Sequence, residues 1–129
     1  MLLATAWVSP IPAAVELLYF NINSVSGLQV TLGWATASEI DNFGFTLYRA
    51  PTSDFAQATA VHFEPSAVPG GTGGGATYAY VDSVPQPGAW WYWLVDVDTQ
   101  GHATTHGPVS TVAQWAASST FYLPVVIRR

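Results

Sequence analysis

Hydrophobic and polar residues alternate with a period of two along nearly the whole chain, and this pattern is typical of β-strands. Residues 28–34 show it most clearly, because an apolar residue occupies every second position there. The same period predicts strands over residues 15–23, 28–34, 43–50, 60–63, 77–82, 90–98 and 109–115. Clusters of glycine and proline separate these segments and mark the turns. We therefore predict an all-β fold of about seven strands.

The strand expected over residues 90–98 differs from the others because it is apolar on both faces. Successive side chains of a strand point to opposite faces of the sheet. One face carries Trp90, Tyr92, Leu94 and Asp96, and the other carries Trp91, Trp93, Val95 and Val97. A sandwich needs only the first of these faces for its core. We expect something else to cover the second.

The same alternation predicts part of the core. It places Phe43, Phe45 and Leu47 on one buried face of the strand over residues 43–50. Trp34 is expected in the core, with Phe45 and Leu94 as its neighbours.

Apolar segments flank the predicted sandwich at both ends. Residues 1–14 form either an apolar N-terminal arm or the end of an export signal, although the basic start of such a signal is absent. Residues 117–129 contain an apolar, β-prone run made of Phe121, Tyr122, Leu123, Val125 and Ile127. Pro124 cannot donate a ladder hydrogen bond, so an extra strand here belongs at a sheet edge. That edge can belong to the same domain or to a neighbouring molecule.

The composition narrows the possible partners. The 129 residues suit one domain, half of them are hydrophobic and only 9% are charged, so we expect much of the surface to be covered by other copies or by a ligand. Lysine is absent and the net charge is −5, which excludes a basic surface for nucleic acid. No apolar run approaches the roughly 20 residues of a transmembrane helix. The lack of cysteine excludes disulfides and thiolate chemistry.

Three segments carry a likeness to a known kind of module. They are residues 34–49 (WATASEIDNFGFTLYR), residues 78–82 (YAYVD), and residues 92–101 (YWLVDVDTQG) with the Gly-Pro-Val that follows at 107–109. Together they resemble strands B to C, strand E, and strand F with its turn into strand G of the fibronectin type III-like, immunoglobulin-like β-sandwich of secreted bacterial surface proteins. The resemblance implies such a sandwich over residues 15–116 and a secreted, extracellular or cell-surface location. It implies architecture more than activity.

The chain departs from that family on the outward face of the strand resembling strand F. Related modules generally carry polar or charged residues there, whereas this chain has Trp93 and Val95. The departure marks this face as a feature particular to this protein.

Two acidic loops are candidates for metal binding. Glu39, Asp41 and Asn42 gather acceptors in one loop, and residues 96–101 are spaced like the start of a calcium loop. The favoured alternative is that the acceptors of the first loop bind backbone amides and shape the turn. Asp96 itself lies in the inward register, so we expect it to be buried with Tyr48, Arg49 or a loop amide as its partner.

Nothing else in the chain predicts catalysis, a metal or a cofactor. We interpret His62, His102 and His106 as solvated loop histidines, since the spacing of the last two suits zinc only on a helix. The glycine-rich stretch at residues 69–75 lacks the lysine of a phosphate-binding loop. No serine stands in a nucleophile motif, and we expect no enzyme.

These observations favour a non-catalytic structural protein that self-associates into a filament or surface layer. The expected self-association or ligand face consists of Trp91, Trp93, Val95, Val97 and Trp115. The terminal segments would pack on neighbouring copies. The alternative is a carbohydrate-binding or adhesion module, in which surface tryptophans stack on glycan rings. A plain monomeric spacer is the third possibility.

Overall fold

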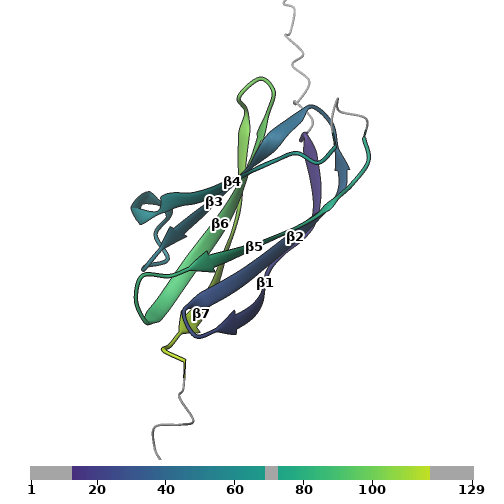
Figure 1. Cartoon of the computed structure of the whole chain (residues 1–129). Coiled ribbons are helices and arrows are strands. Elements are labelled where there is room, and N and C mark those ends of the chain that lie inside the picture. Colours follow the sequence, from purple (N-terminus) through teal and green to yellow (C-terminus); the bar gives the residue numbers. More distant parts are fainter. Residues whose placement is uncertain (1–12, 69–72, 117–129) are drawn as a thin grey trace, which may run out of the picture.

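Two antiparallel β-sheets pack face to face in the computed structural model, which describes residues 13–68 and 73–116 (Figure 1). The strands are β1 (Val15–Ser26), β2 (Gln29–Glu39), β3 (Asn42–Ala50), β4 (Thr59–Pro65), β5 (Thr77–Ser83), β6 (Gly88–Asp98) and β7 (Ala103–Ala113). One turn of 3-10 helix, η1 (Phe55–Gln57), lies between β3 and β4. The predicted all-β class is confirmed.

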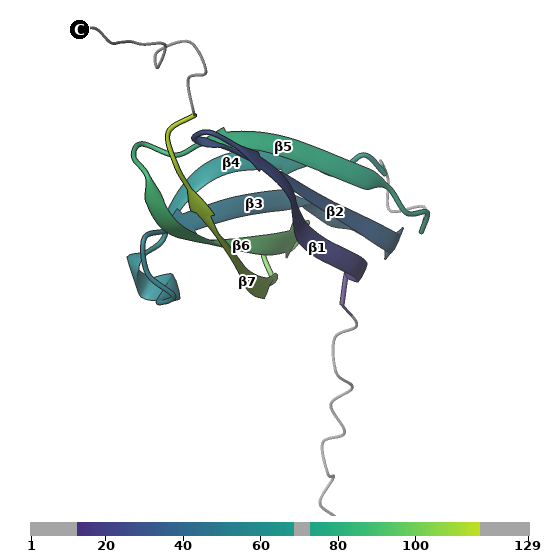
Figure 2. The same ribbon diagram turned by 90° about the horizontal axis from the view of Figure 1, so that it is seen from below.

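The two lateral sides of the sandwich, where the edge strands of the sheets lie, differ from each other. One sheet has the order β1-β2-β5 and the other β4-β3-β6-β7. Strands β1 and β7 lie against each other at one side (Figure 2). At the other side His62 of β4 stacks on Tyr80 of β5, with ring centroids 3.9 Å apart. That side carries the edges of β4 and β5.

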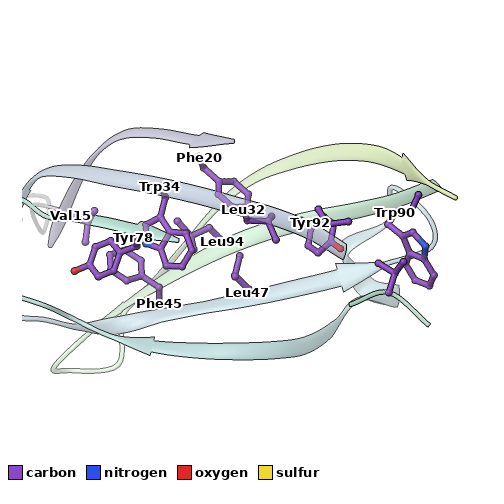
Figure 3. Packing of buried hydrophobic residues seen from close by; sticks show 13 residues of the cluster. Val15, Phe20, Leu32, Trp34, Phe45, Leu47, Tyr78, Trp90, Tyr92 and Leu94 are labelled. Carbon is purple, nitrogen blue, oxygen red and sulfur yellow. The ribbon is translucent and has the colours of Figure 1, made fainter. Parts of the chain in front are cut away.

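Aromatic rings fill the centre of the sandwich (Figure 3). Trp34 is fully buried, and its ring stacks on Tyr78 at 5.3 Å and meets the edge of Phe45 at 5.7 Å. The predicted contact between Trp34 and Phe45 is therefore confirmed. The buried cluster comprises Val15, Phe20, Val30, Leu32, Trp34, Phe45, Leu47, Tyr78, Val84, Trp90, Tyr92, Leu94 and Ala113.

The start of β3 differs from the prediction. The β3–β6 register shifts between Asn42 and Gly44, so Asn42 is buried while Phe43 is 59% exposed. The expectation that Phe43 shares the buried face of Phe45 is wrong, because the irregularity breaks the period of two. Phe63 lies directly over Gly44, and a Cβ placed there would come within 2.5 Å of its ring.

The two described ends of the chain leave from opposite poles. At one pole the N–H of Ile40 donates to the carbonyl of Ala14, just before β1. At the other pole Ala116 lies against Gly27, in the turn between β1 and β2. These two turns bound the 11 residues of β2, so the ends are roughly 35 Å apart. Residues 1–12 of the predicted arm and the predicted strand over 117–129 lie outside the described residues.

Candidate functional site

The outer face of β6 is more covered than its sequence suggests. Trp93 is only 3% exposed and Val95 only 7%, although both point away from the core. Trp91 and Val97 are half-buried. We expected the terminal segments to cover the outer face of β6. The described residues already cover part of it.

Phe55 of η1 covers Trp93. Its ring meets Trp93 edge to face at 5.3 Å and meets Tyr48 of β3 at 5.2 Å. Asp54 caps η1 by accepting a hydrogen bond from the N–H of Ala56 at 3.0 Å, which holds the turn against the sheet. Sequence reasoning missed this contact. The Asp-Phe pair that follows Thr52 and Ser53 was the available signal.

Several aromatic side chains of this sheet still face solvent. Phe43 is 59% exposed, Phe63 41% and Phe55 40%. Phe43 and Phe63 lie together, with ring centroids 5.4 Å apart. We call the set of Phe43, Tyr48, Phe55, Phe63, Trp91 and Trp93 the outer aromatic face. Within this set, Phe43 and Phe63 form an exposed aromatic pair.

The structure does not place the other predicted contact residues on this face. Trp115 follows the end of β7 and is 70% exposed. The terminal-strand residues Phe121, Tyr122, Leu123, Val125 and Ile127 lie outside the described residues.

Strand β5 presents an open and regular edge. It pairs with β2 over all seven of its residues without a register shift, and no described strand pairs with its other side. The N–H of Thr36 donates to the carbonyl of Ala76, and the N–H of Val84 donates to the carbonyl of Leu28. Because bonded pairs alternate in an antiparallel ladder, even-numbered residues of β5 bond to β2. The N–H and C=O groups of its odd-numbered residues therefore point to the open edge.

The other three edge strands are irregular. The ladder of β1 shifts register three times. The ladder of β4 shifts once, and the strand ends at Pro65. The ladder of β7 shifts once, next to the cis bond between Gly107 and Pro108. Irregular ladders and prolines discourage the addition of another strand. Among the edges of the described residues, β5 is the one without these features.

The acidic loop after β2 serves the fold. Glu39 is fully buried and accepts hydrogen bonds from side chains: Thr36 at 2.8 Å, Asn42 at 3.0 Å, Ser66 at 2.5 Å and Tyr78 at 2.6 Å. Burial alone would raise the pKa of Glu39, but these four donors outweigh it and hold the pKa below its usual value. The expectation that Glu39 and Asn42 bond backbone amides is therefore wrong.

Asp96 is buried as predicted, but with a different partner. Its carboxylate contacts Nε2 of His106 at 2.6 Å, from the neighbouring strand β7. Arg49, one of the partners predicted for it, instead binds Asp82 of β5 at 2.9 Å. The sequence could not show this, because Arg49 and Asp82 come from different sheets.

The interpretation of the histidines as solvated loop residues is confirmed for His102 but wrong for His62 and His106. His62 is stacked on Tyr80, and His106 is held by Asp96. Only His102 is mostly exposed, and its Nδ1 contacts Asp98 at 2.9 Å. Each histidine thus uses a ring nitrogen or its ring face for a contact within the chain.

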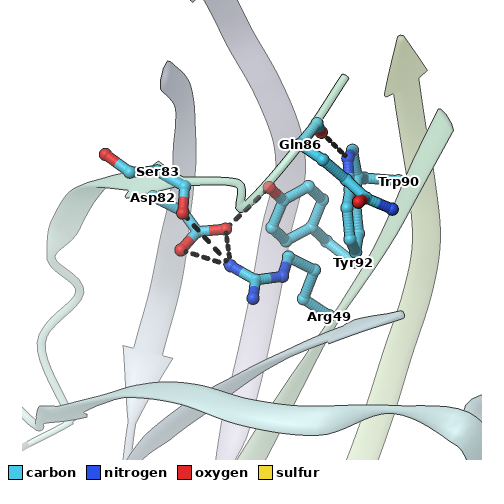
Figure 4. A network of polar contacts seen from close by, with 6 residues as sticks. All are labelled: Arg49, Asp82, Ser83, Gln86, Trp90 and Tyr92. Atoms are coloured by element: carbon cyan, nitrogen blue, oxygen red, sulfur yellow. Dashed lines mark hydrogen bonds and ion pairs between the residues drawn. The ribbon is translucent and has the colours of Figure 1, made fainter. Parts of the chain in front are cut away.

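Figure 4 shows the polar network that joins the two sheets. Nη1 of Arg49 donates to both carboxylate oxygens of Asp82, and the hydroxyl of Tyr92 donates to one of them at 2.8 Å. The guanidinium also lies over the ring of Trp90, 5.1 Å from its centroid. Burial, together with the hydrogen bond and charge of Asp82, raises the pKa of Tyr92 well above its usual value. The network stabilises the side of the sandwich where β4 and β5 form open edges.

The carboxylates of the second acidic loop are also engaged. Asp98 accepts hydrogen bonds from the N–H groups of Gln100 and His102, both at 2.8 Å. A cavity of about 190 Å³ opens beside this loop at the pole where β1 begins. It is smaller than the roughly 300 Å³ at which ligand pockets start. Residues 13–68 and 73–116 bring no three His, Asp or Glu side chains together as a metal cluster.

Among the described residues, no helix is long and apolar enough to cross a bilayer. No protein-family model matches the chain, and no curated protein matches it.

Proposed function

We propose that this protein is a non-catalytic structural subunit that assembles head to tail with copies of itself into an extracellular filament or surface layer. The observation that carries the proposal is the position of the two described ends, at opposite poles of the sandwich. A segment leaving one pole can reach the facing pole of the next copy. Such a heterologous contact repeats along an open chain of subunits unless the rotation closes a ring.

The uncovered surface supports the same proposal. The outer aromatic face exposes Phe43, Phe55 and Phe63, and β5 leaves a regular edge unpaired. A chain with 9% charged residues has few groups to keep such surfaces apart in solution. Contacts between subunits would cover them.

We further propose that the sandwich is fibronectin type III-like. The segments that resemble strands B and E are β2 and β5, which share one sheet. Those that resemble strands C, F and G are β3, β6 and β7, which share the other. Immunoglobulin-like sandwiches divide these strands between their sheets in the same way. This division supports the assignment, and with it an extracellular location.

Truncation tests the proposed function. We expect deletion of residues 119–129 to abolish polymers in electron micrographs and sedimentation while the circular dichroism of the sandwich persists, because the seven described strands end at Ala113. The control keeps the full length but replaces residues 119–129 with serine and glycine, and it should behave like the deletion. Normal polymers from the truncated protein would refute the proposal, as would a full-length chain that stays monomeric at every concentration.

Carbohydrate binding is the second candidate, and the 70% exposure of Trp115 is the observation that favours it. Trp93 is 3% exposed, so its ring face is closed to a sugar. A change of tryptophan fluorescence on adding soluble glycans, lost in Trp115→Ala, would support this function. A response retained in Trp115→Ala would speak against Trp115 as the binding residue.

A further inference from the structure

We infer that the open edge of β5 receives residues 120–127 of a neighbouring copy as an added β-strand. The inference rests on the proposed function and names the two parts of the chain that would join neighbouring copies. Three observations carry it: the geometry of the edge, the pattern of the C-terminal segment, and the pole at which the described chain ends.

No described residue bonds to the outward N–H and C=O groups of Thr77, Ala79 and Val81 on the edge of β5, whereas the carbonyl of Ser83 accepts a hydrogen bond from Nη1 of Arg49 at 3.5 Å. Thr77, Ala79, Val81 and Ser83 point their N–H and C=O groups away from β2, and the side chains of all four are exposed. None of these four residues is charged and none is proline. Native proteins usually protect an exposed edge with charges, prolines or bulges. An edge without that protection suits an added strand, which gains its affinity from main-chain hydrogen bonds.

The C-terminal segment matches this edge in length and chemistry. Strand β5 has 7 residues, and residues 120–127 form an uncharged run one residue longer. Pro124 lacks an N–H, so in an added strand it must face away from β5. N–H direction alternates along a strand, so the residues that bond to β5 are those of the other register: Phe121, Leu123, Val125 and Ile127.

The exit of the chain favours a neighbour over the same molecule. Ala116 lies against Gly27, at the pole where β5 ends near Leu28. Reaching its own β5 would require the segment to reverse direction within the few residues before Thr120. A copy stacked below that pole presents the start of its own β5 to the emerging segment. Residues 117–119, which reach about 10 Å when extended, would cross the junction, and the added strand would run parallel to β5.

A charge placed on the edge tests the acceptor. We expect Val81→Lys to raise the protein concentration needed for assembly by roughly tenfold or more, because a lysine on an edge strand opposes pairing. Val81 is 49% exposed, so the domain should keep its unfolding midpoint. The matched control is Val112→Lys on β7, where the valine is 58% exposed. Loss of assembly in the control but not in Val81→Lys would overturn the inference.

A pair of proline substitutions tests the donor. Val125→Pro removes an N–H that would bond to β5, whereas Val126→Pro removes one that would point away from it. We expect the first variant to lose polymers in sedimentation and the second to keep them. The described strands end at Ala113, so we expect neither variant to alter the circular dichroism of the sandwich. Equal behaviour of the two variants would overturn the inferred register.

Engineered cysteines test whether the pairing joins two molecules. The chain has no cysteine, so a disulfide can form only between introduced residues. Val81→Cys, combined in turn with Leu123→Cys and with Val125→Cys, should give a ladder of oligomers on a non-reducing gel after oxidation. An internally bridged monomer would overturn the inference in favour of pairing within one chain. If truncation abolishes assembly while Val81→Lys assembles normally, this inference fails and the proposed function stands.

Discussion

Glu39 keeps a carboxylate fully out of water, and its hydrogen-bond partners are side chains from three parts of the chain. Thr36 and Asn42 are local, whereas Ser66 follows β4 and Tyr78 belongs to β5. A buried carboxylate is tolerated only when hydrogen bonds replace the water that it has lost. Both oxygens of Glu39 are satisfied here. The residue therefore ties the β2–β3 turn to the start of β5.

We expect the stability of the protein to depend on the charge of Glu39. Its pKa is held below the usual 4.5, so its contribution is fully present above that pH and is lost as the pH falls through the lowered pKa. Glu39→Gln should lower the free energy of unfolding at pH 7 by about 2 kcal/mol, because the NH2 group of the glutamine would then point at side chains that donate hydrogen bonds to Glu39. Urea titrations between pH 7 and pH 3 should show a weaker acid dependence in the variant.

The matched control is Asp41→Asn, which removes an exposed carboxylate two residues away. Asp41 has a left-handed backbone with φ of 54°, a conformation that asparagine also adopts readily. It should leave both stability and acid dependence nearly unchanged. An acid dependence that is the same in Glu39→Gln and the wild type would contradict this role for Glu39.

The smallest element of the fold, η1, covers part of the outer face of β6. Its single turn places Phe55 against Trp93 and Tyr48. Without that ring Trp93 would lose one of the contacts that cover its outward face. The loop thus covers part of a strand that is apolar on both faces.

Phe55→Ala should therefore expose Trp93. We expect tryptophan emission to shift to longer wavelength and the free energy of unfolding to fall by roughly 1–2 kcal/mol, since two edge-to-face aromatic contacts are lost. Phe43→Ala is the control, because Phe43 is 59% exposed and its ring contacts Phe63 rather than a tryptophan. An unchanged emission spectrum in Phe55→Ala would show that Phe55 does not shield Trp93.

The strands could be predicted from the sequence because alternation is a local signal. All seven predicted segments correspond to β1–β7, although β2 ends five residues later and β7 begins six residues earlier than predicted. What could not be predicted depends on residues distant in the chain. Glu39 is 39 residues from Tyr78, and Arg49 is 33 residues from Asp82. The position of Phe43 was missed for another reason, because one shift in register reverses the face of a side chain.

The whole sandwich is closed differently on its two sides. Strands β1 and β7 lie against each other on one side. On the other side the contacts are between side chains: His62 with Tyr80, and Arg49 with Asp82. The ion pair is well shielded, with 17% of the Arg49 side chain and 6% of the Asp82 side chain exposed. It joins the two sheets where their edges are open.

Breaking this ion pair should loosen the whole domain. We expect Arg49→Met to lower the free energy of unfolding by about 3 kcal/mol, because it leaves a buried carboxylate without its cation. The double variant with Asp82→Asn should lose less than the sum of the two single losses, since both act on one interaction. Urea unfolding followed by tryptophan fluorescence measures all three. Strictly additive losses would show that the pair is not coupled.

The two described ends lie at opposite poles, and this arrangement sets the direction in which a mechanical force would act on the domain. Strands β1 and β7 run in the same direction, from the pole near Ala14 to the pole near Gly27. A pull between the two ends therefore acts along the strands, so the ladder hydrogen bonds share the load instead of opening one after another. In a row of linked copies, tension would pass through every domain in this shearing direction.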